Sequence, residues 1–330
     1  MTSPHLRSQP RRFASERAGR RCHPTPATLL AAFWQWLGMR LVSYDAGDGA
    51  RAGVIEEDHI LDAWDLLGEP QRAGLRELLE RDQVGRLRAR QGPQSGRSYP
   101  LSAVQLFPPI LDPEKIVCVG LNYAKHAAES GKDLPQFPAI FGKYRNALAR
   151  PGGVVPLPAA SKTVDFEAEV AFVVGRVAKE VEEADALDYI AGYMLFNDLS
   201  ARDLQFATPQ WMAGKVFDGS APCGPWLVTP EEAGAPDALQ ISLTLNGEQM
   251  QKSSTDGLIF SIPYLFSHLS KLMTLQPGDI VSTGTPEGIG AAREPPVWLA
   301  DGDELVVSSP TLGRLETRIA GRRGSRSAQR

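Results

Sequence analysis

Cysteine is scarce in this chain of 330 residues, which carries only Cys22, Cys118 and Cys223. The three are odd in number and widely spaced, and they form no Cys-x-x-Cys pair. The sequence therefore indicates neither a disulfide framework nor a cysteine zinc site. No apolar run approaches the ~20 residues of a membrane-spanning helix. We expect a protein of a reducing compartment, the cytoplasm, with no membrane partner.

Basic residues are also scarce outside the two ends of the chain. Residues 1–40 carry seven Arg and one Glu, and residues 321–330 carry four Arg and no acid. Of the 35 basic and 39 acidic residues in the whole chain, 24 and 38 remain in residues 41–320, a net charge of −14. A body this acidic repels a phosphate backbone, so we expect no nucleic-acid partner.

The two ends are expected to lie outside the folded body. Residues 1–38 are rich in Arg, Ser and Pro, and we interpret them as a disordered or appended segment. Their apolar stretch, 27–39, is a helix candidate that resembles part of a targeting peptide. We favour an appendage, because a strand pattern begins directly afterwards at Arg40. Residues 321–330 are expected to form a basic, disordered tail.

Residues 39–112 are expected to form a small α/β domain. Its strand patterns occupy 40–44, 52–56 and 58–62, and its helix pattern occupies 75–80. A polar connector at 92–97 leads to a domain boundary near 109–114, which is rich in proline.

Residues 113–320 are expected to form the larger domain, in which short strands predominate. Strand patterns occupy 116–119, 170–174, 241–245 and 305–307. Helical patterns are few and occupy 122–130, 183–190 and 258–273. This balance favours a β-rich α+β fold over an alternating parallel α/β sheet.

Glu167 and Glu169 share one face of a predicted strand, because alternate side chains of a strand point the same way. Asp165 precedes them, and beyond Glu169 the strand becomes wholly apolar. Two carboxylates at the mouth of a buried strand repel each other unless a cation lies between them. Mg²⁺ takes such oxygen ligands, with Mn²⁺ or Ca²⁺ as alternatives. The other interpretation is an edge strand with solvated acids.

A third carboxylate, Asp198, ends another apolar strand pattern at 192–198. Residues 199–205 predict a helical turn, so Asp198 alternatively caps that helix. Three carboxylates that leave core strands match what a metal site needs, since Mg²⁺ keeps further positions for water or substrate. The sequence therefore predicts a metal site formed by Glu167, Glu169 and Asp198.

His126 and Glu129 lie three residues apart, on one face of a predicted helix. A carboxylate beside an imidazole fixes its tautomer and raises its basicity, which produces a base for activating water. A surface ion pair is the alternative interpretation.

Lys215 stands among apolar residues before a loop with Gly and Pro. It can neutralise a substrate carboxylate or a developing enolate, or it can extend to solvent as a surface lysine. Further along, a strand at 281 runs into a Gly-rich turn that ends at Gly290. The glycines of this turn indicate close approach of the backbone to a ligand, and Thr285 offers a hydroxyl. The turn lacks the Lys of a phosphate-binding loop.

Taken in order, these stretches resemble the fumarylacetoacetate hydrolase superfamily, in particular its acylpyruvate hydrolase and oxaloacetate decarboxylase-like branch. The resemblance covers about residues 113–318, and 40–109 resembles the family's variable N-terminal domain. The motifs that carry it are Val119-Gly-Leu-Asn-Tyr-Ala-Lys-His-Ala-Ala-Glu129, the Glu-x-Glu at 167–169, Asn197-Asp-Leu-Ser-Ala-Arg-Asp-Leu-Gln205, Gly214-Lys-Val-Phe-Asp218, Leu275-Gln-Pro-Gly-Asp279 and Thr283-Gly-Thr-Pro286.

The resemblance implies a mixed β-roll that pairs as a homodimer. It implies that Glu167, Glu169 and Asp198 bind the metal and that His126 and Glu129 activate water. Lys215 would share the negative charge of an enolate. Implied substrate contacts come from Tyr123, Lys143, Arg202, Gln205 and Thr285. Departures from the family pattern at Arg150, at Glu287 and in Asp218-Gly219-Ser220 leave the substrate open.

The function expected from this resemblance is hydrolysis of a C–C bond in a small 2,4-dioxo acid of the acylpyruvate or fumarylacetoacetate type. The metal would stabilise the enolate that leaves. Alternatives on the same site are decarboxylation or tautomerisation of oxaloacetate, or isomerisation or hydration of a 2-hydroxydienoate. An inactive metal-binding scaffold is the alternative from another class, although a scaffold needs no His126.

Overall fold

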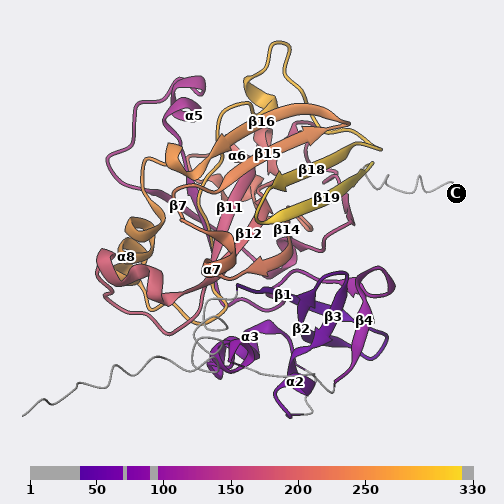
Figure 1. Cartoon of the computed structure of the whole chain (residues 1–330). Helices are drawn as coiled ribbons and strands as arrows, with labels where there is room; N and C mark the ends of the chain where they lie inside the picture. Colours follow the sequence, from indigo (N-terminus) through magenta and orange to yellow (C-terminus); the bar gives the residue numbers. More distant parts are fainter. Residues whose placement is uncertain (1–37, 70–72, 90–95, 322–330) are drawn as a thin grey trace, which may run out of the picture.

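Residues 38–69, 73–89 and 96–321 are described by a computed structural model (Figure 1). The predictions for residues 1–37 and 322–330, and for most of the 92–97 connector, lie outside these residues. No helix in the described ranges is long and apolar enough to cross a membrane.

The N-terminal region is an antiparallel meander with short helices, drawn in indigo and purple in Figure 1. The strands and the helix predicted here are confirmed. The elements are β1 (Arg40–Asp45), β2 (Ala50–Glu56), β3 (His59–Asp62), α2 (Ala63–Leu66), α3 (Leu75–Glu80), α4 (Val84–Arg88), β4 (Ser98–Pro100), the 3₁₀ helix η1 (Leu101–Ala103) and β5 (Gln105–Leu106).

The larger region is rich in strands, which confirms the predicted α+β class. Its helices are α5 (Ala124–Glu129), α6 (Arg202–Gln205), α7 (Pro230–Ala233) and α8 (Ile262–Leu272). Its 3₁₀ helices are η2 (Arg145–Ala147), η3 (Glu183–Tyr189), η4 (Trp211–Gly214), η5 (Thr255–Gly257) and η6 (Gly290–Ala292).

The strands of this region are β6 (Ile116–Gly120), β7 (Ala139–Lys143), β8 (Leu148–Ala149), β9 (Gly153–Pro156), β10 (Val164–Asp165), β11 (Ala168–Val174), β12 (Ile190–Asn197), β13 (Ser200–Ala201), β14 (Ala221–Val228), β15 (Gln240–Leu245), β16 (Glu248–Ser254), β17 (Ile280–Ser282), β18 (Glu304–Ser309) and β19 (Gly313–Ala320).

The longest predicted helix is shorter than its pattern. Residues 258–273 form α8 only from Ile262, because Ser261 caps it by accepting a hydrogen bond from the backbone N–H of Tyr264 at 3.3 Å. Pro263 stands in its first turn, where proline needs no backbone donor. The pattern at 183–190 forms the 3₁₀ helix η3.

One long mixed sheet joins both regions, in the order β4-β3-β2-β1-β14-β12-β11-β17-β6-β7. The N-terminal strands enter it through β1, which pairs antiparallel with β14. A five-stranded sheet, β16-β15-β18-β19-β9, packs on the larger region. The sheets are mixed, since β17 and β6 run parallel while β11 and β12 run antiparallel.

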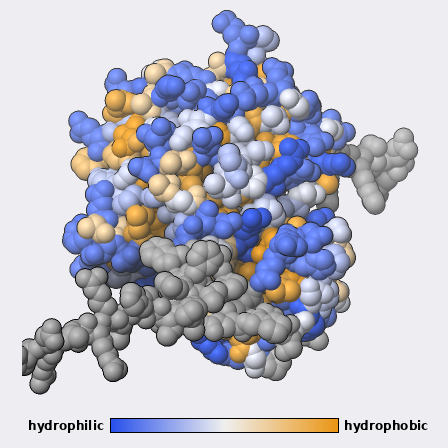
Figure 2. All heavy atoms as spheres, in the orientation of Figure 1, coloured by the Kyte–Doolittle hydropathy of each residue, from blue (hydrophilic) through white to orange (hydrophobic). Residues whose placement is uncertain are grey.

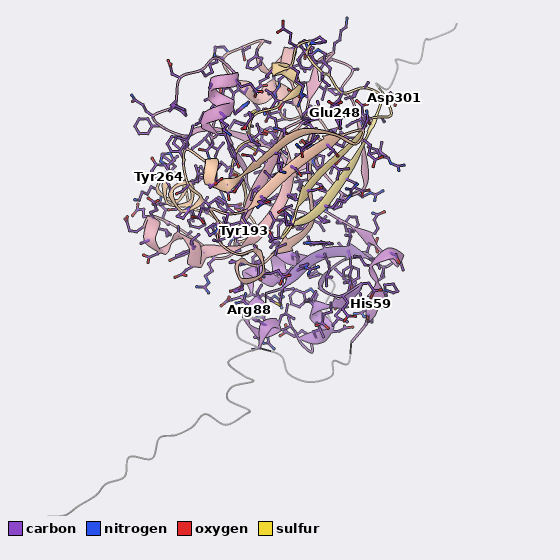
Figure 3. The ribbon with its side chains drawn as sticks, turned by 45° about the horizontal axis from the view of Figure 1, so that its top comes forward. His59, Arg88, Tyr193, Glu248, Tyr264 and Asp301 are labelled. Carbon is purple, nitrogen blue, oxygen red and sulfur yellow. The ribbon has the colours of Figure 1, made fainter. Side chains whose placement is uncertain are left out.

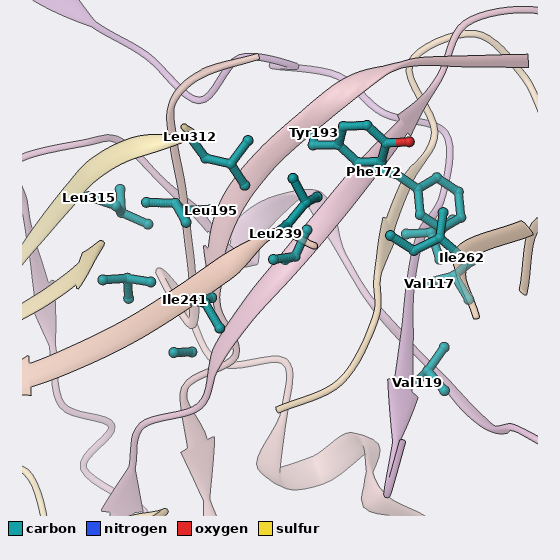
Figure 4. Close-up of a cluster of buried hydrophobic side chains, with 14 of the residues drawn as sticks. Val117, Val119, Phe172, Tyr193, Leu195, Leu239, Ile241, Ile262, Leu312 and Leu315 are labelled. Atoms are coloured by element: carbon teal, nitrogen blue, oxygen red, sulfur yellow. The ribbon is translucent and has the colours of Figure 1, made fainter. Parts of the chain in front are cut away.

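Strand β11 lies inside the long sheet, and all seven of its residues are buried. Val170, Phe172 and Val174 pack in one hydrophobic cluster with the five-stranded sheet, part of which Figure 4 shows. Ala171 and Val173 belong to a second cluster, which includes the apolar side chains of β1, α2 and α3. A strand covered on both faces appears in sequence as a continuous apolar run.

Polar contacts also connect the N-terminal region to the rest of the chain. Arg88, at the end of α4, lies where the two parts meet (Figure 3). Its guanidinium donates to both carboxylate oxygens of Glu231, at 2.6 and 2.7 Å. The division into domains near 109–114 stays a prediction. The face in Figure 2 is mostly hydrophilic, with smaller hydrophobic patches.

Candidate active site

The three predicted metal ligands converge at one end of two paired strands. Glu169 lies in β11, Glu167 just before it, and Asp198 directly after β12. The two strands pair antiparallel, with Ala168 opposite Asn197, so the start of β11 lies beside the end of β12. One oxygen from each carboxylate lies within 4.8 Å of the other two, and all three residues are buried.

Neither alternative for these acids describes the structure. Strand β11 has neighbours on both sides, so its acids are not on a solvated edge. Helix α6 has Ala201 as its N-cap and no capping side chain, so Asp198 does not cap it. Asp165 points elsewhere, since its carboxylate accepts hydrogen bonds from the backbone N–H groups of Gly290 and Ala291.

Three buried cations surround Glu167 and Asp198. Lys215 Nζ lies 2.7 Å from Glu167 Oε2 and 2.8 Å from Asp198 Oδ2. Lys143 Nζ lies 2.6 Å from Asp198 Oδ1, and an Arg202 nitrogen lies 2.7 Å from Glu167 Oε1. Although burial opposes the shift, Lys215 and Arg202 hold the pKa of Glu167 below its usual value. Lys215 is thus a buried ion-paired residue and not a surface lysine.

Glu169 has a different environment. Its Oε2 accepts hydrogen bonds from the Ser282 hydroxyl and, at 3.0 Å, from the backbone N–H of Gly284. Oε1 accepts no hydrogen bond from the residues that the structure describes. Burial, with the charges of Asp198 and Glu167 nearby, raises the pKa of Glu169 well above its usual value.

This donor set fits a hard divalent cation. Asp165, Glu167, Glu169 and Asp198 are four buried carboxylates, but among the described residues only three buried cations contact the group. Glu169 forms an ion pair with none of these three cations, and its Oε1 accepts no hydrogen bond from the described residues. Glu167 and Asp198 keep lone pairs beyond those that their partners use, since an ionised carboxylate accepts at about four positions. Oxygen ligands of this kind suit Mg²⁺, Mn²⁺ or Ca²⁺.

The predicted dyad lies on α5. His126 Nδ1 is 3.4 Å from Glu129 Oε2, and the imidazole is buried. The Glu129 carboxylate also accepts the backbone N–H of Gly288, at 2.9 Å to Oε1 and 3.1 Å to Oε2. Since His126 is buried and Glu129 has a second partner, the pair is not a simple surface ion pair.

A cavity of about 330 Å³ connects the dyad to the carboxylates. Its polar wall is formed by His126, Glu129, Glu167, Glu169 and Lys215. Its apolar wall is formed by Leu121, Phe141, Phe206, Trp211 and Ile289. The cavity therefore offers a charged inner wall beside a largely apolar surface, as is common in small-molecule sites.

Three of the expected substrate contacts line this cavity but are engaged within the protein. Arg202 donates to Asp165, Glu167 and Gln205. Gln205 uses its carbonyl oxygen for that bond. The Thr285 hydroxyl donates to the Ala168 carbonyl at 3.0 Å and accepts from Gln251.

The two other expected contacts lie off the cavity lining. Lys143 is buried behind Asp198 and also donates to the backbone carbonyl of Lys215. Tyr123 is buried, and its hydroxyl has no hydrogen-bond partner among the described residues. Both placements follow from tertiary packing, which residue type alone does not reveal.

Trp211 and Phe141 were not predicted as site residues. Their rings pack edge to face, with centroids 5.8 Å apart. Gly120 makes room for them, because a Cβ at this position would lie 2.3 Å from the Trp211 ring. The sequence feature that could have indicated this aromatic wall is Trp211, which lies four residues before Lys215.

The Gly-rich turn that ends at Gly290 was predicted to approach a ligand, but Gly288 within it lies against other protein atoms. Its φ is +97°, and a Cβ there would lie 2.3 Å from the Met250 carbonyl oxygen. Gly288 therefore approaches protein backbone and presents its N–H to Glu129, while Thr285 and Ile289 of the same turn line the cavity.

We expect Gly288→Ala to lower the turnover number about 10- to 100-fold, because displacing the turn removes the anchor of Glu129 and misplaces the dyad. Mg²⁺ affinity should remain near that of the wild type. Gly302→Ala is the matched control, since Gly302 has a similar φ of +88° but no atom near its Cβ position. Steady-state kinetics and calorimetry check this, and equal losses in both variants would contradict it.

Comparisons with known proteins agree with this architecture. The profile of the family described as fumarylacetoacetate (FAA) hydrolase, C-terminal, matches residues 115–320. An oxaloacetate tautomerase of Xenopus laevis, named as mitochondrial, is 37% identical over 292 residues, which cover 86% of this chain and 91% of the relative.

Two solved structures with isomerase names are also similar. One is a 5-carboxymethyl-2-hydroxymuconate delta-isomerase from Mycobacterium smegmatis, with 34% identity, a TM-score of 0.70 and coverage of 87% of this chain and 100% of that one. The other is a 2-hydroxyhepta-2,4-diene-1,7-dioate isomerase from Mycobacterium marinum, with 31% identity, a TM-score of 0.70 and coverage of 87% and 100%. By sequence and by fold, the chain belongs to the fumarylacetoacetate hydrolase family, a family of enzymes.

Proposed function

We propose that this protein is a divalent-metal-dependent tautomerase or isomerase that interconverts enol and keto forms of a small 2-oxo acid. The observation that carries the proposal is the buried triad of carboxylates beside a cavity that a single oriented imidazole also lines. The names of the relatives support this outcome over C–C hydrolysis, since they are a tautomerase and two isomerases.

The metal would be held by Glu167, Glu169 and Asp198, and Mg²⁺ is the ion that we propose, with Mn²⁺ or Ca²⁺ as alternatives. A divalent cation bound there supplies positive charge that favours the enolate form of a 2-oxo acid. Lys215 keeps its ammonium charged between two carboxylates, because Asp198 and Glu167 raise its pKa against the effect of burial. It contributes fixed positive charge on the same wall of the cavity.

His126 is the group best placed to move a proton. Its Nδ1 faces Glu129, which leaves Nε2 for the cavity. Conversion of enol to keto requires loss of the hydroxyl proton and addition of a proton at the neighbouring carbon. His126 would deliver that second proton from Nε2 and regain one from solvent, so the reaction needs no other reactant.

Hydrolysis of a C–C bond is the second candidate, and the His126–Glu129 contact is compatible with it as well. The same imidazole, oriented by the same carboxylate, can take a proton from water. The two functions therefore share their residues and differ in what occupies the cavity beside Nε2. A metal-binding scaffold explains the triad but gives no role to the dyad.

The two activities are separated by their products. With Mg²⁺ or Mn²⁺ present, we expect the protein to speed loss of the enol absorbance of oxaloacetate without releasing CO₂. We expect no release of carboxylic acid from an acylpyruvate. Rapid formation of pyruvate and a second acid from the acylpyruvate would instead support the hydrolase.

The location and the assembly remain predictions. Cytoplasm is our expectation for this chain, whereas the Xenopus relative is named as mitochondrial. A homodimer is proposed on the family resemblance alone, and the molecular mass in solution tests it.

A further inference from the structure

We infer that Lys132 binds the distal carboxylate of the substrate, so that the site selects 2-oxo dicarboxylates over 2-oxo acids with a neutral far end. This inference rests on the proposed function, since it concerns the same cavity. It begins from the cationic side chains that line the cavity, which are His126, Lys132, Arg202 and Lys215.

Two of these cations already neutralise buried carboxylates of the protein. Lys215 is paired with Glu167 and Asp198. Each nitrogen of Arg202 already donates a hydrogen bond, to Asp165, Glu167 or Gln205. A substrate carboxylate at either residue would share a positive charge that buried carboxylates already balance, so each pairing would gain less than with an unpaired cation.

Lys132 differs from Lys215 and Arg202 in both its exposure and its contacts. It is exposed at the cavity, and its ammonium forms no ion pair or hydrogen bond with any residue in the described ranges. His126 is engaged with Glu129 through Nδ1 and is assigned to proton transfer. Among the cations on the cavity, Lys132 is therefore the one that a second carboxylate can pair with without competing with a carboxylate of the described residues.

The backbone of Lys132 is also fixed. The N–H of Lys132 donates to the Ala127 carbonyl at 2.9 Å, and the N–H of Gly131 donates to the Ala128 carbonyl at 3.0 Å. With Gly131 at a φ of +64°, these two bonds form the Schellman motif that ends α5. The same short helix thus fixes His126 and Lys132 on one wall of the cavity, the imidazole inside and the ammonium at the exposed end.

Charge explains why this position selects for a dicarboxylate. The cavity lining also carries Glu129, Glu167 and Glu169, so a substrate with a second negative charge is repelled unless a cation receives it. Neutral donors such as Ser130 can bind an ester as well as a carboxylate. A free cation distinguishes the two more strongly, because it adds an ion pair that the ester cannot form.

The test compares two ligands that differ only in distal charge, oxaloacetate and its distal methyl ester. We expect Lys132→Met to raise the KM for oxaloacetate roughly 2- to 5-fold, the worth of one exposed ion pair, and to leave the KM for the ester unchanged. Lys132→Arg should keep the preference, and Lys132→Glu should disfavour oxaloacetate further. Lys125→Met is the matched control, because Lys125 lies on α5 but pairs with Glu287 at 3.6 Å, off the cavity lining.

A binding measurement separates this inference from the proposed function. Calorimetry with Mg²⁺ and a 2-oxo dicarboxylate that cannot enolise, 3,3-dimethyl-2-oxobutanedioate, needs no turnover. If the wild type turns over neither oxaloacetate nor its ester, the proposed function fails. The inference still stands in that case if Lys132→Met weakens binding of this dicarboxylate and does not weaken binding of its distal ester. Equal affinity of wild type and Lys132→Met for the dicarboxylate would overturn the inference, whatever the activity.

Discussion

Glu169→Ala is expected to abolish activity and to weaken Mg²⁺ binding by more than about 100-fold. Losing a residue that itself binds the metal should lower metal affinity more than losing a residue that only hydrogen-bonds to a metal ligand. Glu169 is the cleanest of the three carboxylates to remove. Its side chain accepts hydrogen bonds from Ser282 and Gly284 but forms no ion pair with any described residue. Its loss therefore leaves no buried cation without a partner.

Glu167→Ala and Asp198→Ala would give less clear results. Removing Glu167 strips Lys215 and Arg202 of a partner, and removing Asp198 does the same to Lys143 and Lys215. Without Asp198, Lys143 has no carboxylate partner among the described residues, and a buried cation left unpaired destabilises the fold by about 3–5 kcal/mol. Lys215 and Arg202 each keep one carboxylate in either variant and should lose less. Loss of activity in these two variants would thus mix metal binding with unfolding.

Calorimetry with Mg²⁺ and a thermal unfolding curve should be measured together on Glu169→Ala. Glu248→Ala is the control for removal of one acid, because Glu248 is exposed on β16, as Figure 3 shows. Glu169→Ala should unfold near the wild-type temperature and bind Mg²⁺ poorly. Unchanged Mg²⁺ affinity would remove the carboxylate triad as the metal site.

His126→Ala is expected to lower the turnover number roughly 10²–10⁴-fold, the usual contribution of a general acid or base. The imidazole has Glu129 as its hydrogen-bond partner and forms no hydrogen bond with the three metal-site carboxylates, so KM and Mg²⁺ affinity should change little. Glu129→Gln should show a smaller loss of the same kind, because it removes the charge that orients the imidazole but not the imidazole itself.

The measurement is turnover at saturating substrate and metal, for both dyad variants. Lys125→Ala serves as the control on the same helix, since its side chain is exposed and pairs only with Glu287 among the described residues. A turnover number near that of the wild type in His126→Ala would show that another group moves the proton. A parallel loss of Mg²⁺ affinity would show that α5 supports the metal site instead.

Much of the site could be predicted because it follows from local periodicity. Glu167 and Glu169 alternate with apolar residues, and the run after them predicts a strand covered on both faces. The apolar run before Asp198 predicts a second core strand. Antiparallel pairing of these two strands is enough to bring the three carboxylates together.

The partners of the predicted residues could not be obtained in this way. Arg202 and Thr285 are polar residues beside a cavity, and nothing local shows that Asp165 and Ala168 already bind them. Lys143 lies 55 residues before Asp198, and only the fold shows that it supports that carboxylate from behind. The pairing of β1 with β14, which extends the central sheet into the N-terminal region, could not be predicted from local sequence either.

Lys132 was missed for a further reason. It lies just beyond the helical pattern at 122–130, in a stretch for which the sequence predicts neither helix nor strand. The Gly131-Lys132 pair is a helix-ending signal, because glycine there adopts the positive φ of a Schellman motif. That signal would have placed Lys132 close to the dyad, although it would not have shown the lack of a partner.

The central claim is that the protein moves a proton on a 2-oxo acid without breaking a C–C bond, and proton NMR in D₂O tests it most directly. With Mg²⁺ and the enol form of oxaloacetate, the wild type should speed formation of the keto form, with one deuterium entering at the carbon next to the carbonyl. Pyruvate should form no faster than without protein, and Glu169→Ala should give the uncatalysed rate. An uncatalysed rate with the wild type, or pyruvate formed in step with loss of the enol, would contradict the account.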